Sequence, residues 1–268
     1  MDSGPSGMST FWSRLAGRTP NARKHRASSC DANLLLMSFT PASLRFFRQL
    51  ATNNNKQWFE AHRDDYEQHV REPMRELVEE MFARFRTFAP EVGGDPKRSM
   101  FRINRDVRFS KDKSPYKTHA ACWFHHRGAT RNVGTEAEAG SAGFYFHLEP
   151  GGNSMIGAGV WMPPRPQLNR IRDSIAEKPE PFLAVARGLP KRFGGIHEYS
   201  TLKRMPRGYD ENHPAAKWLK LQSFTSGRSL ADSDVTGAKL GSLLAREYQA
   251  LLPLVRWING AFGLSDKP

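Results

Sequence analysis

The chain has 268 residues, of which 38% are hydrophobic, and its 17 Phe and 6 Trp supply enough apolar surface for one large domain. Lys and Arg number 40 against 27 Asp and Glu, and the net charge of +13 favours anionic partners: nucleic acid, phosphorylated metabolites or acidic membrane surfaces. Basic charge that only aids solubility is the alternative. No apolar run approaches the roughly 20 residues that span a bilayer. Cys30 and Cys122 stand in unrelated contexts, so we expect no disulfide framework and a reducing cytoplasm.

Residues 1–36 differ in composition from the rest of the chain. They are rich in Ser, Gly and Arg, with a basic cluster at residues 23–26 and little that can pack. We expect a disordered basic tail, or an extension upstream of a true start at Met37. An organelle transit segment and a nucleic-acid-binding arm are the alternatives. The folded domain is expected over residues 37–262, followed by a short C-terminal tail at 263–268.

Helical patterns open the domain. Thr40 and Pro41 form a helix-start signal, because Thr is a good N-cap and Pro fits the first helical turn. Apolar residues then recur at helical spacing, with a turn at 53–55, a kink or restart at Pro73 and an end at Pro90. They are Leu44, Phe47, Leu50, Trp58, Phe59, Tyr66, Val70, Met74, Leu77, Val78, Met81, Phe82 and Phe85. We assign this stripe to the core rather than to a cofactor site.

The middle of the chain changes to a period of two residues, which is typical of strands that bury one face. Apolar and polar residues alternate at 101–104, 122–125 and 144–149, and a glycine-rich strand is expected over 155–161. Residues 127–140 and 150–152 have the composition of turns between antiparallel strands.

Helical spacing returns after the strands. We expect one helix around 168–175, a second that opens at Pro179, a short one around Trp218 and a final one over 240–258 with Pro253 inside it. Helices, then strands, then helices is the order of an α+β domain. The predicted fold is therefore a single α+β domain, in which a mainly antiparallel sheet is flanked by N- and C-terminal helices.

The most strongly patterned polar stretch lies between residues 102 and 117. Six cations stand there against two acids, a net charge of +4: Arg102, Arg105, Arg108, Lys111, Lys113 and Lys117 against Asp106 and Asp112. The three arginines recur at three-residue spacing, and each guanidinium presents fixed donors that match phosphate or carboxylate. Strand alternation predicts one face with Arg102, Asn104, Asp106 and Arg108, and Arg105 on the other.

We predict that this stretch binds an anion. The candidate ligand-binding residues are Arg102, Arg105, Asp106, Arg108, Lys113, Tyr116 and Lys117, with Asp106 orienting a neighbouring arginine. Residues 110–115 suit a phosphate-contacting loop, but they lack the glycine-rich nest and following helix of a Walker loop. The alternative is a structural ion-pair network that ties the arginines to acidic helix faces such as Glu79 and Glu80.

Residues 101–109 and the Lys-Ser-Pro-Tyr-Lys sequence at 113–117 resemble the signature of the domain of unknown function 2461 family, whose members are mostly bacterial. Further similar pieces occur at residues 54–63, 143–151, 206–209 and 213–214. The resemblance covers about residues 37–260 and supports Met37 as the start of the domain. It implies no particular chemistry, because none is established for the family.

Tyr145, His147 and Glu149 share one face of a predicted strand. A His-x-Glu pair can supply two metal ligands, or a base with its orienting partner, so His147 and Glu149 are weak catalytic candidates. Histidines at 119, 125 and 126 lie on a nearby predicted strand and extend the set of candidate metal ligands. No H-E-x-x-H, EF-hand, G-x-S-x-G or paired Cys/His spacing occurs, so we predict neither a metal nor a cofactor. The alternative is a strand face that hydrogen-bonds the arginines.

Aromatic residues accompany these polar positions. Trp123, Tyr145 and Trp161 are candidates for stacking a base or a sugar, although partial burial under the helices is the alternative. The sequence therefore predicts recognition of an anionic ligand, phosphorylated or nucleic-acid-like, at a basic pocket centred on residues 102–117. The alternatives are a hydrolase or transferase that acts on a phosphorylated or carboxylated small molecule, with His147 and Glu149 as acid and base, and a scaffold whose basic face meets a protein partner.

Overall fold

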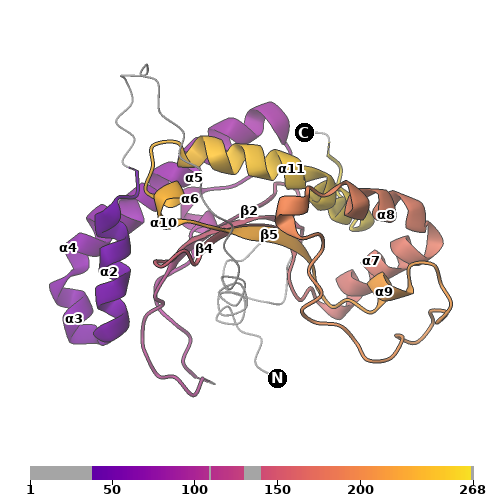
Figure 1. Ribbon diagram of the computed structural model, residues 1–268, viewed down its shortest axis with the longest axis horizontal. Helices are drawn as coiled ribbons and strands as arrows, with labels where there is room; N and C mark the ends of the chain where they lie inside the picture. The colour runs from indigo at the N-terminus through magenta and orange to yellow at the C-terminus, as the bar shows by residue number, and fades with distance from the viewer. Residues whose placement is uncertain (1–37, 109, 130–139, 267–268) are drawn as a thin grey trace.

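The computed structural model describes residues 38–108, 110–129 and 140–266; the predicted tail, Cys30 and Met37 lie outside these ranges. Its centre is a five-stranded antiparallel sheet whose strands follow one another in chain order (Figure 1). The strands are β1 (Val92–Gly93), β2 (Ala120–His126), β3 (Gly143–Leu148), β4 (Ser154–Val160) and β5 (Phe224–Leu230). With helices on either side in sequence, the fold is α+β, as predicted. Within the described ranges, no helix is both long and apolar enough to cross a membrane.

The N-terminal helices up to Phe88 form where the sequence predicts them, whereas a further short helix at residues 96–99 was not predicted. They are α2 (Pro41–Thr52), α3 (Lys56–Ala61), α4 (Arg63–Tyr66), η1 (Glu67–Arg71), α5 (Glu72–Phe88) and the short α6 (Pro96–Ser99). Thr40 caps α2: its hydroxyl accepts a hydrogen bond from the backbone N–H of Ala42. Asn55 caps α3 in the same way, by accepting from the N–H of Trp58.

The predicted irregularity at Pro73 is a widened turn of π-helix. The π-helix η1 ends two residues before Pro73, which stands in the first turn of α5. Proline has no N–H to donate to the carbonyl four residues earlier, and its ring crowds that carbonyl, so the preceding turn cannot keep α-helical geometry. The helix therefore continues past Pro73 with a change in its winding rather than a break.

The C-terminal half supplies the second set of helices. They are α7 (Arg165–Glu177), α8 (Pro179–Gly188), the 3₁₀ turn η3 (Lys191–Phe193), α9 (Ala216–Leu219), α10 (Asp232–Val235) and α11 (Leu240–Ala261). Pro253 lies inside α11 and is exposed, so it faces away from the core. The carboxylate of Asp232 accepts hydrogen bonds from the backbone N–H groups of Gly151 and Gly152 and pairs with Arg48, which fixes the β3–β4 turn against α10 and α2.

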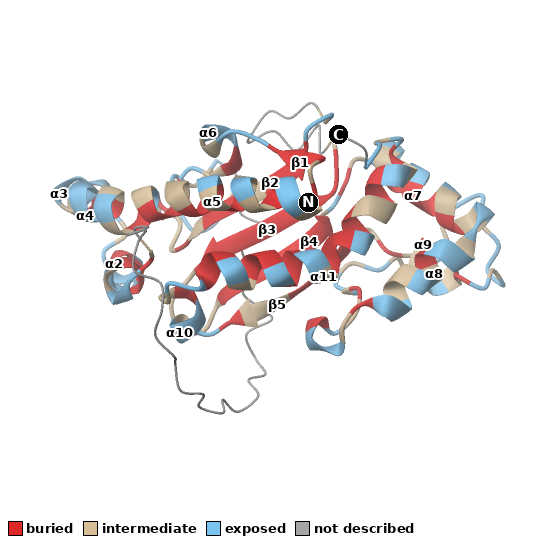
Figure 2. Ribbon diagram, turned by 90° about the horizontal axis from the view of Figure 1, so that it is seen from above, coloured by how far each residue is buried: buried red, intermediate tan, exposed pale blue. Residues whose placement is uncertain are grey.

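The long helices α5 and α11 cover one face of the sheet, here called the helix face (Figure 1). Seen from above, their buried residues point to the sheet and their exposed residues away from it (Figure 2). Phe85 of α5 and Tyr248 of α11 both stack on Phe144 of β3, with ring centroids 5.5 and 4.7 Å apart. The Tyr248 hydroxyl donates a hydrogen bond to the Tyr145 carbonyl, which satisfies it inside the core.

The opposite face of the sheet, here called the second face, carries a separate and smaller cluster. Ala121, Tyr145 and Met155 are buried there, and Phe101 and Trp123 pack against them. Trp123 and Tyr145 are direct cross-strand partners on this face, as the alternation predicts. However, β3 is buried at every position, so its predicted open polar face, with Tyr145 available for stacking, is wrong.

Residues 101–104 and 224–230 differ from the sequence-based expectation. Residues 101–104 do not form a regular strand. Two isolated bridges, Met100 to Cys122 and Asn104 to Tyr116, connect this segment to β2 and to the residues that precede β2. In addition, residues 224–230, predicted as no element, form β5 along the edge of β4. Its Ser, Thr, Gly and Arg interrupt the apolar pattern that identifies a buried strand.

Candidate functional site

A two-stranded ribbon built from residues 100–122 carries the predicted binding residues. Four positions separate its bridge residues on one strand, Met100 and Asn104, whereas six separate Tyr116 and Cys122 on the other. The second strand therefore contains two extra residues between the bridges, which is a bulge. Bulges redirect side chains and are common beside functional sites. Lys117, whose backbone N–H donates to the carbonyl of Ile103, directly precedes the bulge, and the buried His119 lies within it.

The connection between α2 and α3 holds this ribbon in place. The side chain of Asn54 donates to the backbone carbonyl of Tyr116 at 2.9 Å and accepts from its N–H at 3.1 Å. The Tyr116 ring is buried and stacks on Phe59, with centroids 4.1 Å apart. Tyr116, predicted as a ligand contact, is therefore an anchor of the ribbon in this structure.

Lys117 is the central cation of the ribbon. Its ammonium group donates to the backbone carbonyl of Arg102 at 3.0 Å and lies 5.6 Å from the centroid of the Phe101 ring. Partial burial, followed by the positive charges of Arg102 and Arg105, lowers the pKa of Lys117 to about 8. These three side chains, which we call the cationic cluster, thus lie close enough to repel one another.

Two histidines lie behind the cationic cluster. The rings of His119 and His147 are 5.5 Å apart and both are buried. Burial lowers the pKa of His119 well below its usual value, and His147, Lys117 and Arg105 lower it further. Both histidines are therefore neutral at neutral pH.

The hydrogen bonds of His147 define its tautomer. Its Nε2 lies 2.7 Å from the carbonyl oxygen of Asn153, which can only accept, so Nε2 carries the proton. Its Nδ1 then accepts from the Tyr145 hydroxyl at 3.2 Å. Burial lowers the pKa of His147 to about 4. Glu149, its predicted partner, lies 3.7 Å from Nε2.

The other predicted residues lie toward the exposed tip of the ribbon. Asp106 and Arg108 form an ion pair of 2.6 Å, and the hydrogen bonds from Arg108 lower the pKa of Asp106 to about 2. Lys113 donates to the carbonyl of Val107. Asp106 thus orients an arginine as predicted, but the Arg108 side chain is 75% exposed and points to solvent.

Arg105 has a carboxylate partner in the tip. It pairs with Asp112, which also accepts hydrogen bonds from the N–H and hydroxyl of Ser114. By contrast, Glu79 and Glu80 pair with Arg75 and Arg84 of their own helix, so the ribbon arginines are not tied to them.

The remaining candidates lie elsewhere. His125 and His126 are at the far end of β2, beside β1, and His126 lies 2.7 Å from the carbonyl of Ser265. Trp161 follows the end of β4. Across the described ranges, no group of three or more His, Cys, Asp or Glu side chains has the arrangement of a metal site.

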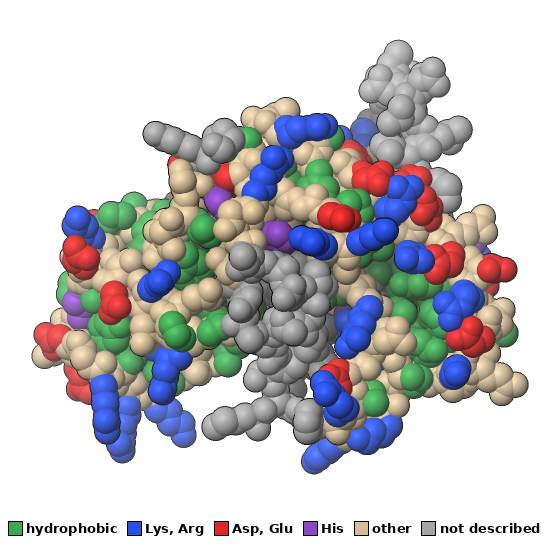
Figure 3. All heavy atoms as spheres, turned by 180° about the vertical axis from the view of Figure 1, so that it is seen from behind, with side chains coloured by type: hydrophobic (Ala, Val, Ile, Leu, Met, Phe, Trp, Pro, Cys, Tyr) green, Lys and Arg blue, Asp and Glu red, His purple; other side chains and the backbone are tan. Residues whose placement is uncertain are grey.

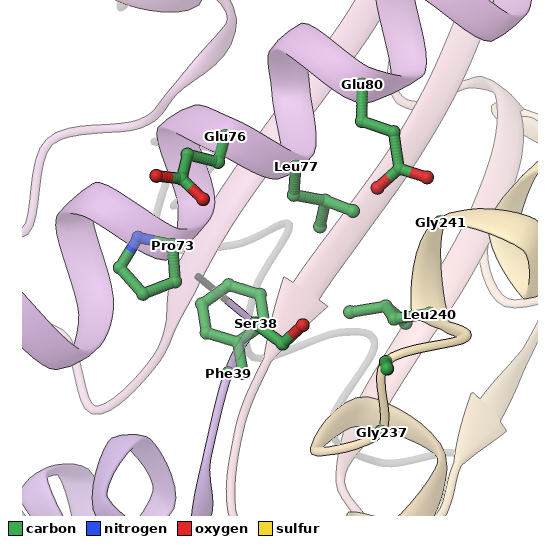
Figure 4. Close-up of a pocket in the computed structure, with 10 residues that line it drawn as sticks. Ser38, Phe39, Pro73, Glu76, Leu77, Glu80, Gly237, Leu240 and Gly241 are labelled. Atoms are coloured by element: carbon green, nitrogen blue, oxygen red, sulfur yellow. The ribbon is translucent and has the colours of Figure 1, made fainter. Parts of the chain in front are cut away.

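Two hollows lie near the long helices and the ribbon. One lies between α5 and the start of α11, has a volume of about 30 Å³ and is lined by Glu76, Glu80, Leu77 and Gly241 among others (Figure 4). That is room for about one water molecule, which is too small for a ligand. The other is an open depression of about 350 Å³ beside the ribbon, lined by Phe47, Arg48, Ala51, Thr118, Glu149, Pro150 and Gly151.

Sequence reasoning missed Asn54 and Phe101 as parts of this site. Asn54 stands in one of the motifs that carry the family resemblance, but its partner Tyr116 is 62 positions away, and a single sequence does not show that pairing. Phe101 is a large apolar residue, and its sequence alone would assign it to the core. Its position under Lys117 depends on how the two strands of the ribbon pair.

The comparisons with known proteins identify a family and no function. Searches of curated proteins and of solved structures found no significant match. The model of one protein family, described as "Conserved hypothetical protein (DUF2461)", matches residues 42–257, which include the whole sheet, the ribbon and most of α11. The chain therefore belongs to the DUF2461 family.

Proposed function

We propose that this protein binds an anionic ligand, with a phosphate-like group, at the cationic cluster of Arg102, Arg105 and Lys117. The observation that supports the proposal is a concentration of positive charge without matching acids. In the described parts of the chain, no carboxylate lies within 4.0 Å of a charged nitrogen of Arg102 or Lys117, while Arg105 has one partner, Asp112. Three cations and one acid leave a local charge of +2, which suits a dianion.

The chemistry of the three side chains fits this ligand. Arginine presents a planar fork of donors for two oxygens of one anionic group, and lysine adds a compact charge. One Lys117 hydrogen already goes to the Arg102 carbonyl, which holds the ammonium group in place and leaves the others for a ligand. The neutral His119 adds no charge of its own.

The same geometry bears on the two alternatives. In a hydrolase or transferase, His147 would have to move a proton to or from a substrate. Both of its ring nitrogens are engaged within the protein and the ring is fully buried. These contacts favour a supporting role for His147, and they favour ligand binding over proton transfer as the function of the site. A protein-interaction scaffold would not need Lys117 to be held in a partly buried position with a lowered pKa.

The test is a titration with sulfate and with pyrophosphate, followed by calorimetry or NMR, on wild type and on Arg102→Gln and Lys117→Gln. Each substitution should weaken binding at least tenfold, because a charge-assisted contact contributes about 1.5–3 kcal/mol. Lys111→Gln is the matched control, since it removes one exposed charge from the same ribbon. Loss of binding in all three variants, or in none of them, would contradict the proposed site.

The melting temperatures of the same variants distinguish anion binding from a structural role of Arg102 and Lys117. The variants relieve repulsion in the ligand-free protein, so their melting temperatures should be unchanged or slightly raised. Marked destabilisation would instead indicate that the cations hold the fold together.

A further inference from the structure

The segment between β4 and β5 is a second basic part of the chain. Residues 161–222 contain 12 Lys and Arg against 6 Asp and Glu, a net charge of +6. They form the lobe of α7, α8 and α9 at one end of the molecule (Figure 1), and in the view from behind Lys and Arg side chains gather at its lower left (Figure 3). The lobe therefore attracts anions independently of the ribbon.

Arg172 of α7 is the buried cation of this lobe. It is 5% exposed, yet no carboxylate of the described residues lies within 4.0 Å of its guanidinium group. Its Nη2 donates to the backbone carbonyl of Leu221 at 3.0 Å, whereas its Nε is buried and makes no hydrogen bond to a described residue. A buried charge without a counter-charge is strongly unfavourable. A buried N–H of this kind marks a place where a water molecule or an ion binds.

Arg165 stands two helical turns before Arg172 on the same face of α7. Seven residues correspond to about 10 Å along the helix, and long side chains lean toward the helix N-terminus, so Arg172 extends toward Arg165. Arg165 is exposed and also has no carboxylate within 4.0 Å in the described ranges. Burial lowers the pKa of Arg172, and the charge of Arg165 lowers it further, so the two guanidinium groups repel one another.

The neighbouring acid, Asp173, is engaged with a different residue. Its carboxylate accepts a hydrogen bond of 2.7 Å from the hydroxyl of Tyr209, which also interacts electrostatically with Arg172. Tyr209 belongs to residues 203–215, here called the strap, which are mostly exposed. A second contact, of 3.1 Å, joins His213 of the strap to the carbonyl of Ala176. The strap thus lies along α7 beside Arg172.

The two contacts of the strap come from motifs that the cationic cluster does not use. Tyr209 and His213 stand in the pieces at 206–209 and 213–214 that carry the family resemblance. Met205 and Tyr209 are only partly buried where they pack on the core. An exposed segment with so few buried contacts opens more easily than a packed helix. Its opening uncovers Arg172 while α7 stays folded.

We propose that Arg165 and Arg172 together bind a dianionic oxyanion, such as a phosphate group, under the strap, and that the Tyr209–Asp173 hydrogen bond holds the strap over this site. Two guanidinium groups supply a charge of +2 and two planar forks of donors, which match the oxygens of such a group. The site is separate from the cationic cluster, so it goes beyond the proposed function and does not depend on it.

The first experiment follows the Nε–H resonance of Arg172 by NMR while sulfate is added. The resonance should shift and saturate in wild type, and equally in Arg102→Gln/Lys117→Gln, which removes the cationic cluster. Arg165→Gln should weaken this binding at least tenfold, because it removes a charge-assisted contact. Acetate, with one charge, should bind less tightly than sulfate. Lys178→Gln is the matched control, since it removes an exposed charge at the end of α7 and should change nothing.

The second experiment loosens the strap. Tyr209→Phe removes the hydrogen bond to Asp173, which opposes opening, so sulfate affinity at Arg172 should rise by about two- to tenfold. Tyr199→Phe is the control, because Tyr199 is an exposed tyrosine of the same lobe outside the strap. Its sulfate affinity should equal that of wild type.

A third variant, Arg172→Met, tests the site by calorimetry. Wild type should bind two sulfate ions, and Arg172→Met should keep only the one at the cationic cluster. Should Arg172→Met fail to fold, Arg165→Gln, at an exposed position, gives the same test.

The outcomes separate this inference from the proposed function. If sulfate leaves the Arg172 resonance unchanged in wild type and in Tyr209→Phe, water is the partner of Arg172 and the inference is wrong. The proposed function then still stands or falls with Arg102 and Lys117. Equal affinity in Tyr209→Phe and wild type, or in Arg165→Gln and wild type, also contradicts the inference. Sulfate binding at Arg172 that survives while Arg102→Gln has no effect elsewhere would support the inference and overturn the proposed function.

Discussion

Lys117 lies in an environment that differs from that of an exposed cation. It keeps one hydrogen bond to the Arg102 carbonyl, loses part of its hydration and lies near two guanidinium groups. A lysine in such a place binds a proton less tightly than in water, and an anion that enters restores the missing counter-charge. Ligand binding and protonation of Lys117 are therefore linked.

The linkage predicts a pH dependence of anion binding. Below pH 8 the ammonium form predominates and binds the anion, and above pH 8 the neutral amine does not, so affinity should fall as pH rises through about 8. Sulfate is the suitable probe, because its own charge is constant over this range. In Lys117→Arg the decline should disappear below pH 10, since guanidinium stays charged. An unchanged decline in Lys117→Arg would assign the titration to another group.

Among elements, the ribbon and the α2–α3 connection act as one unit. In the described residues the ribbon has two isolated bridges, and the backbone N–H of Lys117 donates to the carbonyl of Ile103 at 2.8 Å. Asn54 adds two hydrogen bonds to Tyr116, the residue directly before Lys117, and so ties this part of the ribbon to the α2–α3 connection.

Asn54 is accordingly predicted to position the cationic cluster. Asn54→Ala leaves the backbone groups of Tyr116 without these partners, so we expect weaker sulfate binding, by about five- to tenfold, with a loss of stability of about 1–2 kcal/mol. The measurement is sulfate affinity together with the titration of Lys117 by NMR, whose midpoint should rise toward that of a free lysine. Asn53→Ala is the control, because Asn53 contacts only its own helix. An unchanged Lys117 midpoint in Asn54→Ala would show that the asparagine does not position the cluster.

The helices were predictable because each carries its own signals, whereas the site was not. Thr40, Pro41 and the stripe from Leu44 to Phe85 define the N-terminal helices without reference to the rest of the chain. The alternation at Phe144 and Phe146 likewise defines β3. β5 is held by pairing with β4, and that partnership is not visible in its own polar sequence.

The charges of the site were visible in the sequence, but their directions were not. Alternation grouped Arg102 with Arg108, and a regular strand would have kept them on one face. Residues 101–104 are instead irregular, and Arg102 and Arg105 both lie near Lys117, while Arg108 turns to Asp106 in solvent. A two-residue offset between bridges depends on the pairing of distant segments, so no local pattern contains it.

At the scale of the whole molecule, Glu247 is the central buried charge. This α11 side chain is 2% exposed and pairs with Arg192 of η3, Arg228 of β5 and Arg246 of its own helix. Burial alone would raise the pKa of Glu247, but the hydrogen bonds from Arg192 and Arg228 and the charge of Arg228 lower it below its usual value. One carboxylate thus joins three separate parts of the C-terminal half.

Glu247→Gln should destabilise the protein by about 2 kcal/mol. Removing one member of a buried ion pair costs about 3–5 kcal/mol, and the partial exposure of the arginines reduces that figure. Urea unfolding measures the change, with Glu180→Gln as control, since the Glu180–Arg187 pair is exposed. Because the pKa of Glu247 is lowered in the folded state, its contribution is present above about pH 4.5 and lost as pH falls further. A cost equal to that of Glu180→Gln would contradict this role.

The contacts of Asp232 with Arg48, Gly151 and Gly152 join parts of the chain that are synthesised at very different times. Arg48 and Asp232 are 184 positions apart, and Tyr248, which fills the core under Phe85 and Phe144, follows later still. During translation the first four strands leave the ribosome when α5 alone is available to cover their Phe-rich face, because α11, the other helix on that face, does not yet exist. Folds that rely on such distant partners form slowly and expose apolar surface meanwhile. The nascent chain therefore depends on being shielded from aggregation until almost the whole protein has emerged.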